Sequence, residues 1–165
     1  MTATQIELKL DKEIGSFIRS NVFQQSLIKA GKPITYKKFL EDKILMIAAI
    51  RVGIPFSLFK LIQDYAPFSE NDWANFLDIS TKSLQRYRVS SEHRFKPIHS
   101  EKIIEMAEVT KVGLDVFGHM EKLRLWLITP NYALGNFKPI DLLKDSYGKE
   151  LVINELTRIN HGILV

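Results

Sequence analysis

The chain of 165 residues contains no cysteine. A disulfide framework, a thiolate metal site and a cysteine nucleophile are therefore excluded. No run of residues alternates β-branched and polar side chains, so the sequence offers no convincing strand. The longest apolar run, residues 44–50, is far too short to span a bilayer. The first residues lack a basic segment followed by an apolar run, so we expect no signal peptide and a cytoplasmic protein.

Apolar residues recur at helical spacing along most of the chain, which predicts an all-α fold. We expect three regions. Residues 1–38 form an N-terminal helical appendage, whose first ten residues are expected to be loose. Residues 39–98 form a helix-turn-helix domain, and residues 99–165 form a smaller helical domain. Helices are expected from about 39 to 52, from 97 to 117, and from about 148 to 160, because Gly and Pro punctuate the chain there.

Residues 68–88 have the outline of a helix-turn-helix, which places one helix in the DNA major groove. Ser69 is a natural N-cap for the first helix, with Asp72 completing a capping box. Asp78 occupies the turn, where Gly is usual, and Asp tolerates left-handed backbone better than most residues. The apolar faces of the two helices are expected to bury Trp73, Phe76, Leu77, Leu84 and Tyr87.

The charge of the chain is concentrated on this motif. The net charge is +4, and the window from Lys82 to Lys96 alone carries a net +4. A basic patch of this kind suits phosphate binding, and its coincidence with the motif disfavours a merely solvated loop. Gln85 and Arg86 have the chemistry for base edges, and Arg88, Arg94 and Lys96 suit phosphates. The predicted DNA-binding residues are Thr81, Lys82, Ser83, Gln85, Arg86, Arg88, Arg94 and Lys96.

The sequence gives little support to a catalytic or a metal-binding function. The histidines are scattered, and no two have the i, i+4 spacing of a helical metal site. The chain has no Gly-rich phosphate loop and no nucleophile elbow. Asp141 and Asp145 lie four residues apart, but a solvated helix face explains them better. We therefore expect no catalytic residue, no metal and no cofactor.

The last three residues, Ile163 to Val165, are large and aliphatic and follow a helix break at Gly162. Such a tail is unfavourable in water unless something covers it. Either it folds back onto its own core or it inserts into a partner.

Several motifs along the chain resemble the Xre/MbcA/ParS antitoxins. In the C-terminal half these are Val116-Phe-Gly118, Trp126-Leu127, Thr129-Pro-Asn131, Ala133-Leu-Gly135, Pro139-Ile-Asp-Leu-Leu143 and Arg158-Ile-Asn-His-Gly162. Gly53-Ile-Pro55 and Leu84-Gln-Arg86 resemble the Xre-like DNA-binding half of the same family. The resemblance covers roughly residues 40–165. The chain departs from the family at Asp78, which replaces a turn glycine, and at Asn136-Phe137, which replaces a Gly-rich continuation.

The resemblance implies a type II antitoxin that dimerises and represses its own operon by binding operator DNA. Its toxin would be a RES-domain enzyme that attacks NAD, by degrading it or by transferring ADP-ribose. In such pairs the C-terminal region covers the active-site cleft of the toxin, so residues 99–165 would bind toxin and dimerise. The expected toxin-binding residues are Glu155, Arg158, Ile159, His161, Gly162, Ile163, Leu164 and Val165.

Two other functions stay open on the sequence. One is a stand-alone helix-turn-helix repressor with a helical dimerisation domain, and the other is an antitoxin that has lost DNA binding. A neighbouring reading frame that encodes a RES-type protein separates the antitoxin from the plain repressor.

Overall fold

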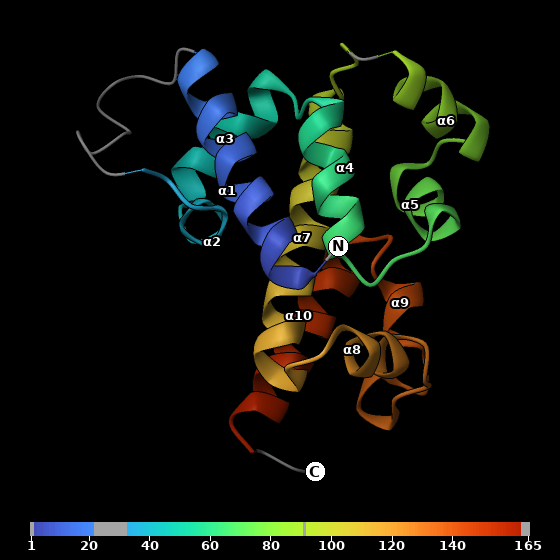
Figure 1. The fold of residues 1–165 in the computed structure, drawn as a ribbon. Coiled ribbons are helices and arrows are strands. Elements are labelled where there is room, and N and C mark those ends of the chain that lie inside the picture. The colour runs from blue at the N-terminus through green and yellow to red at the C-terminus, as the bar shows by residue number, and fades with distance from the viewer. Residues whose placement is uncertain (1, 22–32, 91, 163–165) are drawn as a thin grey trace. The chain divides into compact units, whose positions relative to one another are not determined.

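The structure is a computed structural model that describes residues 2–21, 33–90 and 92–162. Within these ranges it contains helices and no strand, and one isolated antiparallel bridge joins Pro55 and Arg94. The all-α prediction is confirmed. The helices (Figure 1) are α1 (Ala3–Ser20), α2 (Tyr36–Phe39), α3 (Lys43–Val52), α4 (Phe56–Tyr65), α5 (Glu70–Leu77), α6 (Thr81–Val89), α7 (Pro97–Phe117), α8 (Met120–Leu127), the 3-10 helix η2 (Tyr132–Leu134), α9 (Pro139–Leu142) and α10 (Ser146–Asn160).

Packing divides the chain into two compact units. The first comprises Met1–Tyr65 and Thr81–Ile104, and the second comprises Ala66–Ser80 and Glu105–Val165. Helix α7 therefore begins in the first unit and continues into the second. These units are defined by packing and combine segments that are far apart in the sequence. They do not test the three regions expected at 1–38, 39–98 and 99–165, which remain a prediction.

Helix α1 corrects the expectation that the first ten residues are loose. Thr2 starts the helix with a capping box, in which Gln5 N–H donates to the Thr2 hydroxyl and Thr2 N–H donates to the Gln5 side chain. The helix packs against α4 and α2 (Figure 1). The buried residues on its apolar face are Leu10, Ile14, Phe17 and Ile18. Helix α1 is therefore an ordered part of the first unit.

Polar contacts also hold α1 in place. The hydroxyl of Tyr65, at the end of α4, donates to Glu7 at 2.5 Å. The backbone N–H of Tyr36, at the start of α2, donates to Asp11 at 2.8 Å. The ring of Tyr36 is buried, and this burial raises the pKa of its hydroxyl far above the usual value. The appendage thus shares both core and hydrogen bonds with the rest of its unit.

The helix expected from about residue 39 starts later than predicted. Asp42 caps α3 by accepting hydrogen bonds from the backbone N–H groups of Ile44 and Leu45, both at 3.1 Å. Residues 36–39 form the separate short helix α2, capped by Thr35. The Thr35 cap and the Asp42 cap lie close together, so they start two separate helices. The apolar spacing alone predicts one helix there.

The helix-turn-helix boundaries are confirmed. Ser69 and Asp72 form the predicted capping box, with Ser69 N–H donating to the Asp72 carboxylate at 2.8 Å and Asp72 N–H donating to the Ser69 hydroxyl at 3.1 Å. Asp78 ends α5 with φ 52° and ψ 44°, the left-handed conformation expected for the turn. The predicted inward residues Trp73, Phe76, Leu77 and Leu84 are buried, and Tyr87 is half-buried.

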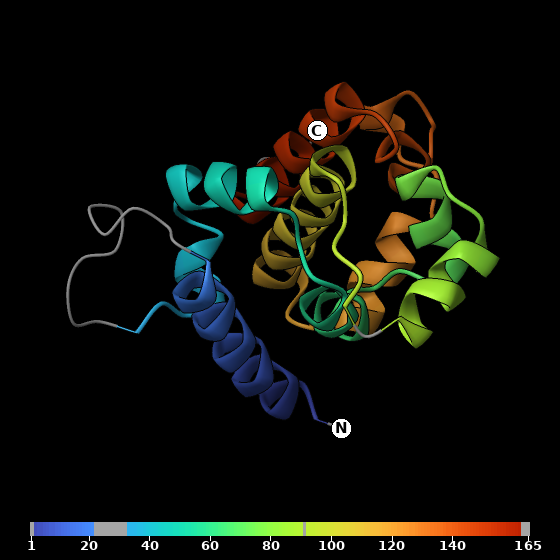
Figure 2. The same cartoon turned by 90° about the horizontal axis from the view of Figure 1, so that it is seen from above.

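In the second unit, α10 lies beside the C-terminal part of α7 in both views (Figures 1 and 2). Lys149 on α10 pairs with Glu108 on α7 at 3.3 Å. Gly148 is needed where α10 meets the end of α9, because a Cβ there would lie 1.8 Å from the carbonyl oxygen of Leu142. Helix α10 therefore takes its place without a backbone shift only with a glycine at this position.

Replacing Gly148 with Ala is expected to lower the free energy of unfolding by about 2–3 kcal/mol, because backbone must move to admit the methyl group. Gly15→Ala is the matched control inside a helix. Its new Cβ would meet only the flexible Arg19 side chain, so stability should hold or rise by up to about 1 kcal/mol. Chemical denaturation of both variants measures this, and equal losses would contradict the account of α10.

Candidate functional site

Helix α6 displays the predicted polar face. Leu84 is buried on its inner side, and this orients the opposite side of the helix outward. Among the predicted DNA-binding residues on α6, Thr81 and Ser83 are half-buried, and the exposed ones are Lys82, Gln85, Arg86 and Arg88. Arg86 lies 5.9 Å from the ring of Tyr87 and donates a long hydrogen bond of 3.4 Å to Ser83. These contacts orient its guanidinium and leave it exposed.

The loop after α6 is held by a ring stack. Tyr87 and His93 are parallel, with centroids 3.5 Å apart and an interplanar angle of 7°, and both meet Phe95 edge-on. The backbone of His93 donates to Ser90 and accepts from Phe56. Burial, and secondly the charge of His99, lower the pKa of His93. The stack ties the basic loop to α6, and the lowered pKa of His93 favours neutral imidazole.

Arg94 has partners inside the first unit. Its guanidinium donates to the carbonyl of Gly53 at 3.0 Å and lies 5.8 Å from the ring of Phe17 on α1. Lys96, two residues on, is exposed. Arg94 therefore joins the basic loop to α1 and to the end of α3, in addition to its predicted phosphate role, and like Lys96 it is exposed.

The predicted toxin-binding residues gather near the end of α10. Glu155 and Arg158 form an ion pair with each other at 3.0 Å, and their side chains are 12% and 38% exposed. Ile159 is half-buried, and His161 and Gly162 are exposed. Ile163, Leu164 and Val165 lie outside the described residues. A partner that binds Glu155 or Arg158 must compete with an existing i, i+3 pair.

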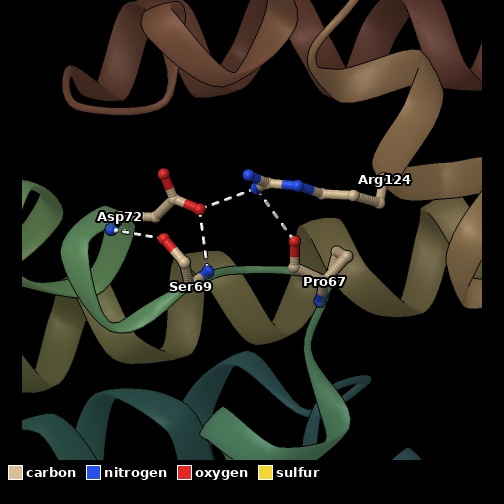
Figure 3. Close-up of polar contacts among 4 residues, drawn as sticks. All are labelled: Pro67, Ser69, Asp72 and Arg124. Atoms are coloured by element: carbon tan, nitrogen blue, oxygen red, sulfur yellow. Dashed lines mark hydrogen bonds and ion pairs between the residues drawn. The ribbon is translucent and has the colours of Figure 1, made fainter.

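A polar cluster that the sequence did not predict surrounds Arg124 on α8 (Figure 3). Its Nη1 donates to the Asp72 carboxylate at 2.6 Å and to the carbonyl of Pro67 at 3.1 Å. The same carboxylate oxygen of Asp72 accepts from Ser69 N–H at the start of α5. Asp72 and Arg124 are 52 residues apart, so no local spacing signals the pair.

An open groove of about 480 Å³ lies beside this cluster in the second unit. Leu125 and Ile128, which line it, are 63% and 39% exposed. Its other lining residues are Pro67, Phe68, Ser69, Met120, Glu121 and Arg124. The groove is therefore mostly apolar with one anchored cation.

The described part of the chain contains no group of three or more His, Asp or Glu side chains placed to hold a metal ion. Within the same part, no helix combines the length and apolarity that a bilayer crossing requires.

Two family models match consecutive parts of the chain. Residues 45–108 match the antitoxin Xre-like helix-turn-helix domain, and residues 113–162 match the antitoxin Xre/MbcA/ParS C-terminal toxin-binding domain. The chain belongs to the Xre/MbcA/ParS antitoxin family. It is an antitoxin and not an enzyme, and a helix-turn-helix domain precedes its toxin-binding domain, as the sequence resemblance implied. Helices α1 and α2 lie outside both models.

Two proteins named Antitoxin Xre agree with the family models. The chain is 29% identical over 118 residues to Antitoxin Xre of Photorhabdus laumondii, covering 71% of this chain and 79% of that protein. It is 28% identical over 120 residues to Antitoxin Xre of Yersinia enterocolitica, covering 72% of this chain and 80% of that protein. A solved chain from the M. tuberculosis MbcT–MbcA toxin–antitoxin complex has 19% identity and a TM-score of 0.49, with 73% of this chain and 95% of that chain covered.

The pKa of His93 generates a pH prediction. The folded pKa lies below the unfolded value of about 6.5, so the folded state favours neutral His93. Stability from this residue is present above about pH 6.5 and is lost as the pH falls toward the folded pKa. His93→Phe keeps a ring on Tyr87 and is expected to lose less stability between pH 7.5 and 5.5, measured by urea denaturation. Identical losses in both proteins would contradict this assignment.

Proposed function

We propose that this antitoxin neutralises a RES-domain toxin, which consumes NAD by degrading it or by transferring ADP-ribose, and that it binds operator DNA to repress its own operon. The order of the two matched domains carries the proposal, because it places a DNA-binding motif before a toxin-binding domain in one chain. A cytoplasmic homodimer within a larger toxin–antitoxin complex belongs to the same proposal.

The exposed cations of the motif support the DNA half. Lys82, Arg86 and Arg88 lie exposed on α6, and Lys96 lies exposed in the loop that follows. Cations on one helix and its following loop suit a backbone of phosphates, and Gln85 and Arg86 suit base edges. Binding through such cations depends strongly on salt concentration.

The second half of the chain supports a different partner. From Glu101 to Val165 there are eight bases and nine acids, so charge does not favour DNA there. Large apolar side chains are nevertheless exposed in this half, among them Leu125, Tyr132, Phe137, Tyr147 and Leu151. Aromatic and aliphatic anchors of this kind are typical of protein interfaces. We propose that the end of α10 and the tail occupy the active-site cleft of the toxin.

Removing Lys82 and Arg86 together, as Lys82→Ala with Arg86→Ala, is expected to weaken operator binding at least about tenfold and to reduce its salt dependence, because phosphate and base contacts are lost. Toxin neutralisation should persist. Gel shifts at two salt concentrations measure this. Lys37→Ala with Lys38→Ala is the matched control, since it removes the same charge from the exposed side of α2. Unchanged affinity of the Lys82/Arg86 variant would refute the DNA half.

Ending the chain at Asn160 is expected to abolish neutralisation and leave DNA binding intact, because the proposed cleft-filling tail is lost. Growth and cellular NAD are measured during co-expression with the protein of the neighbouring reading frame. A variant with residues 161–165 replaced by Gly and Ser keeps the length and tests the side chains alone. Full rescue of growth and NAD by the shortened chain would refute the role of the tail.

A further inference from the structure

The helix-turn-helix is divided between the two compact units. Family resemblance assigns both α5 and α6 to the DNA-binding domain. Packing instead groups Ala66–Ser80, which contains α5, with Glu105–Val165, which contains the whole matched toxin-binding domain. The chain passes from one unit to the other between Ser80 and Thr81, directly after the turn. The first helix of the motif thus packs as part of the toxin-binding unit.

Arg124 is a polar link that holds α5 in this unit (Figure 3). It lies on α8, inside the matched toxin-binding domain, and both of its hydrogen bonds reach the segment where α5 begins. The Arg124 and Asp72 side chains are 35% and 22% exposed, so the pair is partly shielded from water and salt. Such a charge-assisted contact is directional and restrains position more than a fully exposed pair does.

The cap of α5 does not depend on Arg124. Ser69 and Asp72 bond each other reciprocally, and Asp72 also complements the helix dipole. Phe68, Trp73 and Phe76 add a buried edge-to-face cluster with centroids 5.1–6.1 Å apart. Loss of Arg124 should therefore leave α5 helical while freeing it from α8, which makes Arg124 a positioning residue.

We propose that Arg124, through Asp72, couples toxin occupancy to operator affinity. This inference rests on the proposed function. A toxin bound on the matched domain meets the unit that contains α5, and α5 is one half of the motif whose other helix reads DNA. The groove residues Leu125 and Ile128 flank the same arginine, so a partner on this face of α8 also contacts the link. By linkage, operator DNA changes toxin affinity by the same factor.

Four proteins test the coupling: the wild type, Arg124→Ala, Arg124→Lys and Lys149→Ala. Lys149→Ala is the matched control, because it removes a comparably shielded ion pair of the same unit that does not touch α5. The probe is a labelled duplex of the DNA upstream of this reading frame. Its dissociation constant is measured with and without saturating protein from the neighbouring frame.

The wild type and Lys149→Ala are expected to show a toxin-dependent change of at least about fivefold in either direction. Arg124→Ala should reduce the change to within about twofold while still binding each partner, and Arg124→Lys should recover part of it. A wild-type-sized change in Arg124→Ala overturns the coupling. Wild-type protein that binds both partners without any change also overturns it, and leaves the proposed function standing. Wild-type protein that binds neither refutes both.

Hydrogen exchange gives a readout that needs no DNA. In the wild type, toxin binding should alter the exchange of amides in α5 as well as those in α10. In Arg124→Ala the α10 amides should still respond while the α5 response is lost. An unchanged α5 response in Arg124→Ala overturns the assigned link.

Discussion

One carboxylate, that of Asp72, sets the position of α5. The helix has only eight residues, so the hydrogen bonds at its start are a large share of those that hold it together. A single oxygen of Asp72 accepts from Ser69 N–H at 2.8 Å and from Arg124 at 2.6 Å. The first bond fixes where the helix begins, and the second fixes what it is attached to. Local capping and tertiary attachment therefore meet at one side chain, and the geometry of the motif depends on both.

Local signals explain what could be predicted from the sequence. The capping box at Ser69 and the left-handed turn at Asp78 define α5, and the Pro and Gly at its ends define α7. These features depend on residues within four positions of one another. The capping box at Thr2 is equally local, yet from the sequence we expect the first ten residues to be loose because they lie at a chain terminus. The burial of α1 arises from contacts with α4, which spacing alone does not reveal.

In the candidate sites, too, local features could be predicted from the sequence and long-range contacts could not. The exposed face of α6 follows from the inward position of Leu84, so helical periodicity was enough to predict it. The Arg124–Asp72 pair spans 52 residues, and the Arg94 bond to Gly53 spans 41, so both required the fold. Glu155 and Arg158 were assigned outward roles, although their i, i+3 spacing permits the pair that the structure contains.

The separation of charge along the chain means that salt would act differently on the two proposed partners, operator DNA and a toxin. Phosphate contacts by exposed cations weaken as salt rises, because condensed counterions are no longer released favourably. Apolar contacts around Leu125, Tyr147 or Leu151 have no such dependence. Arg94 adds a structural restraint to the basic loop, since it binds the Gly53 carbonyl and covers Phe17 of α1, a helix outside both family models. The added helix thus restrains the loop that carries the proposed phosphate-binding charge, and the near-neutral half of the chain is the part proposed to bind a toxin.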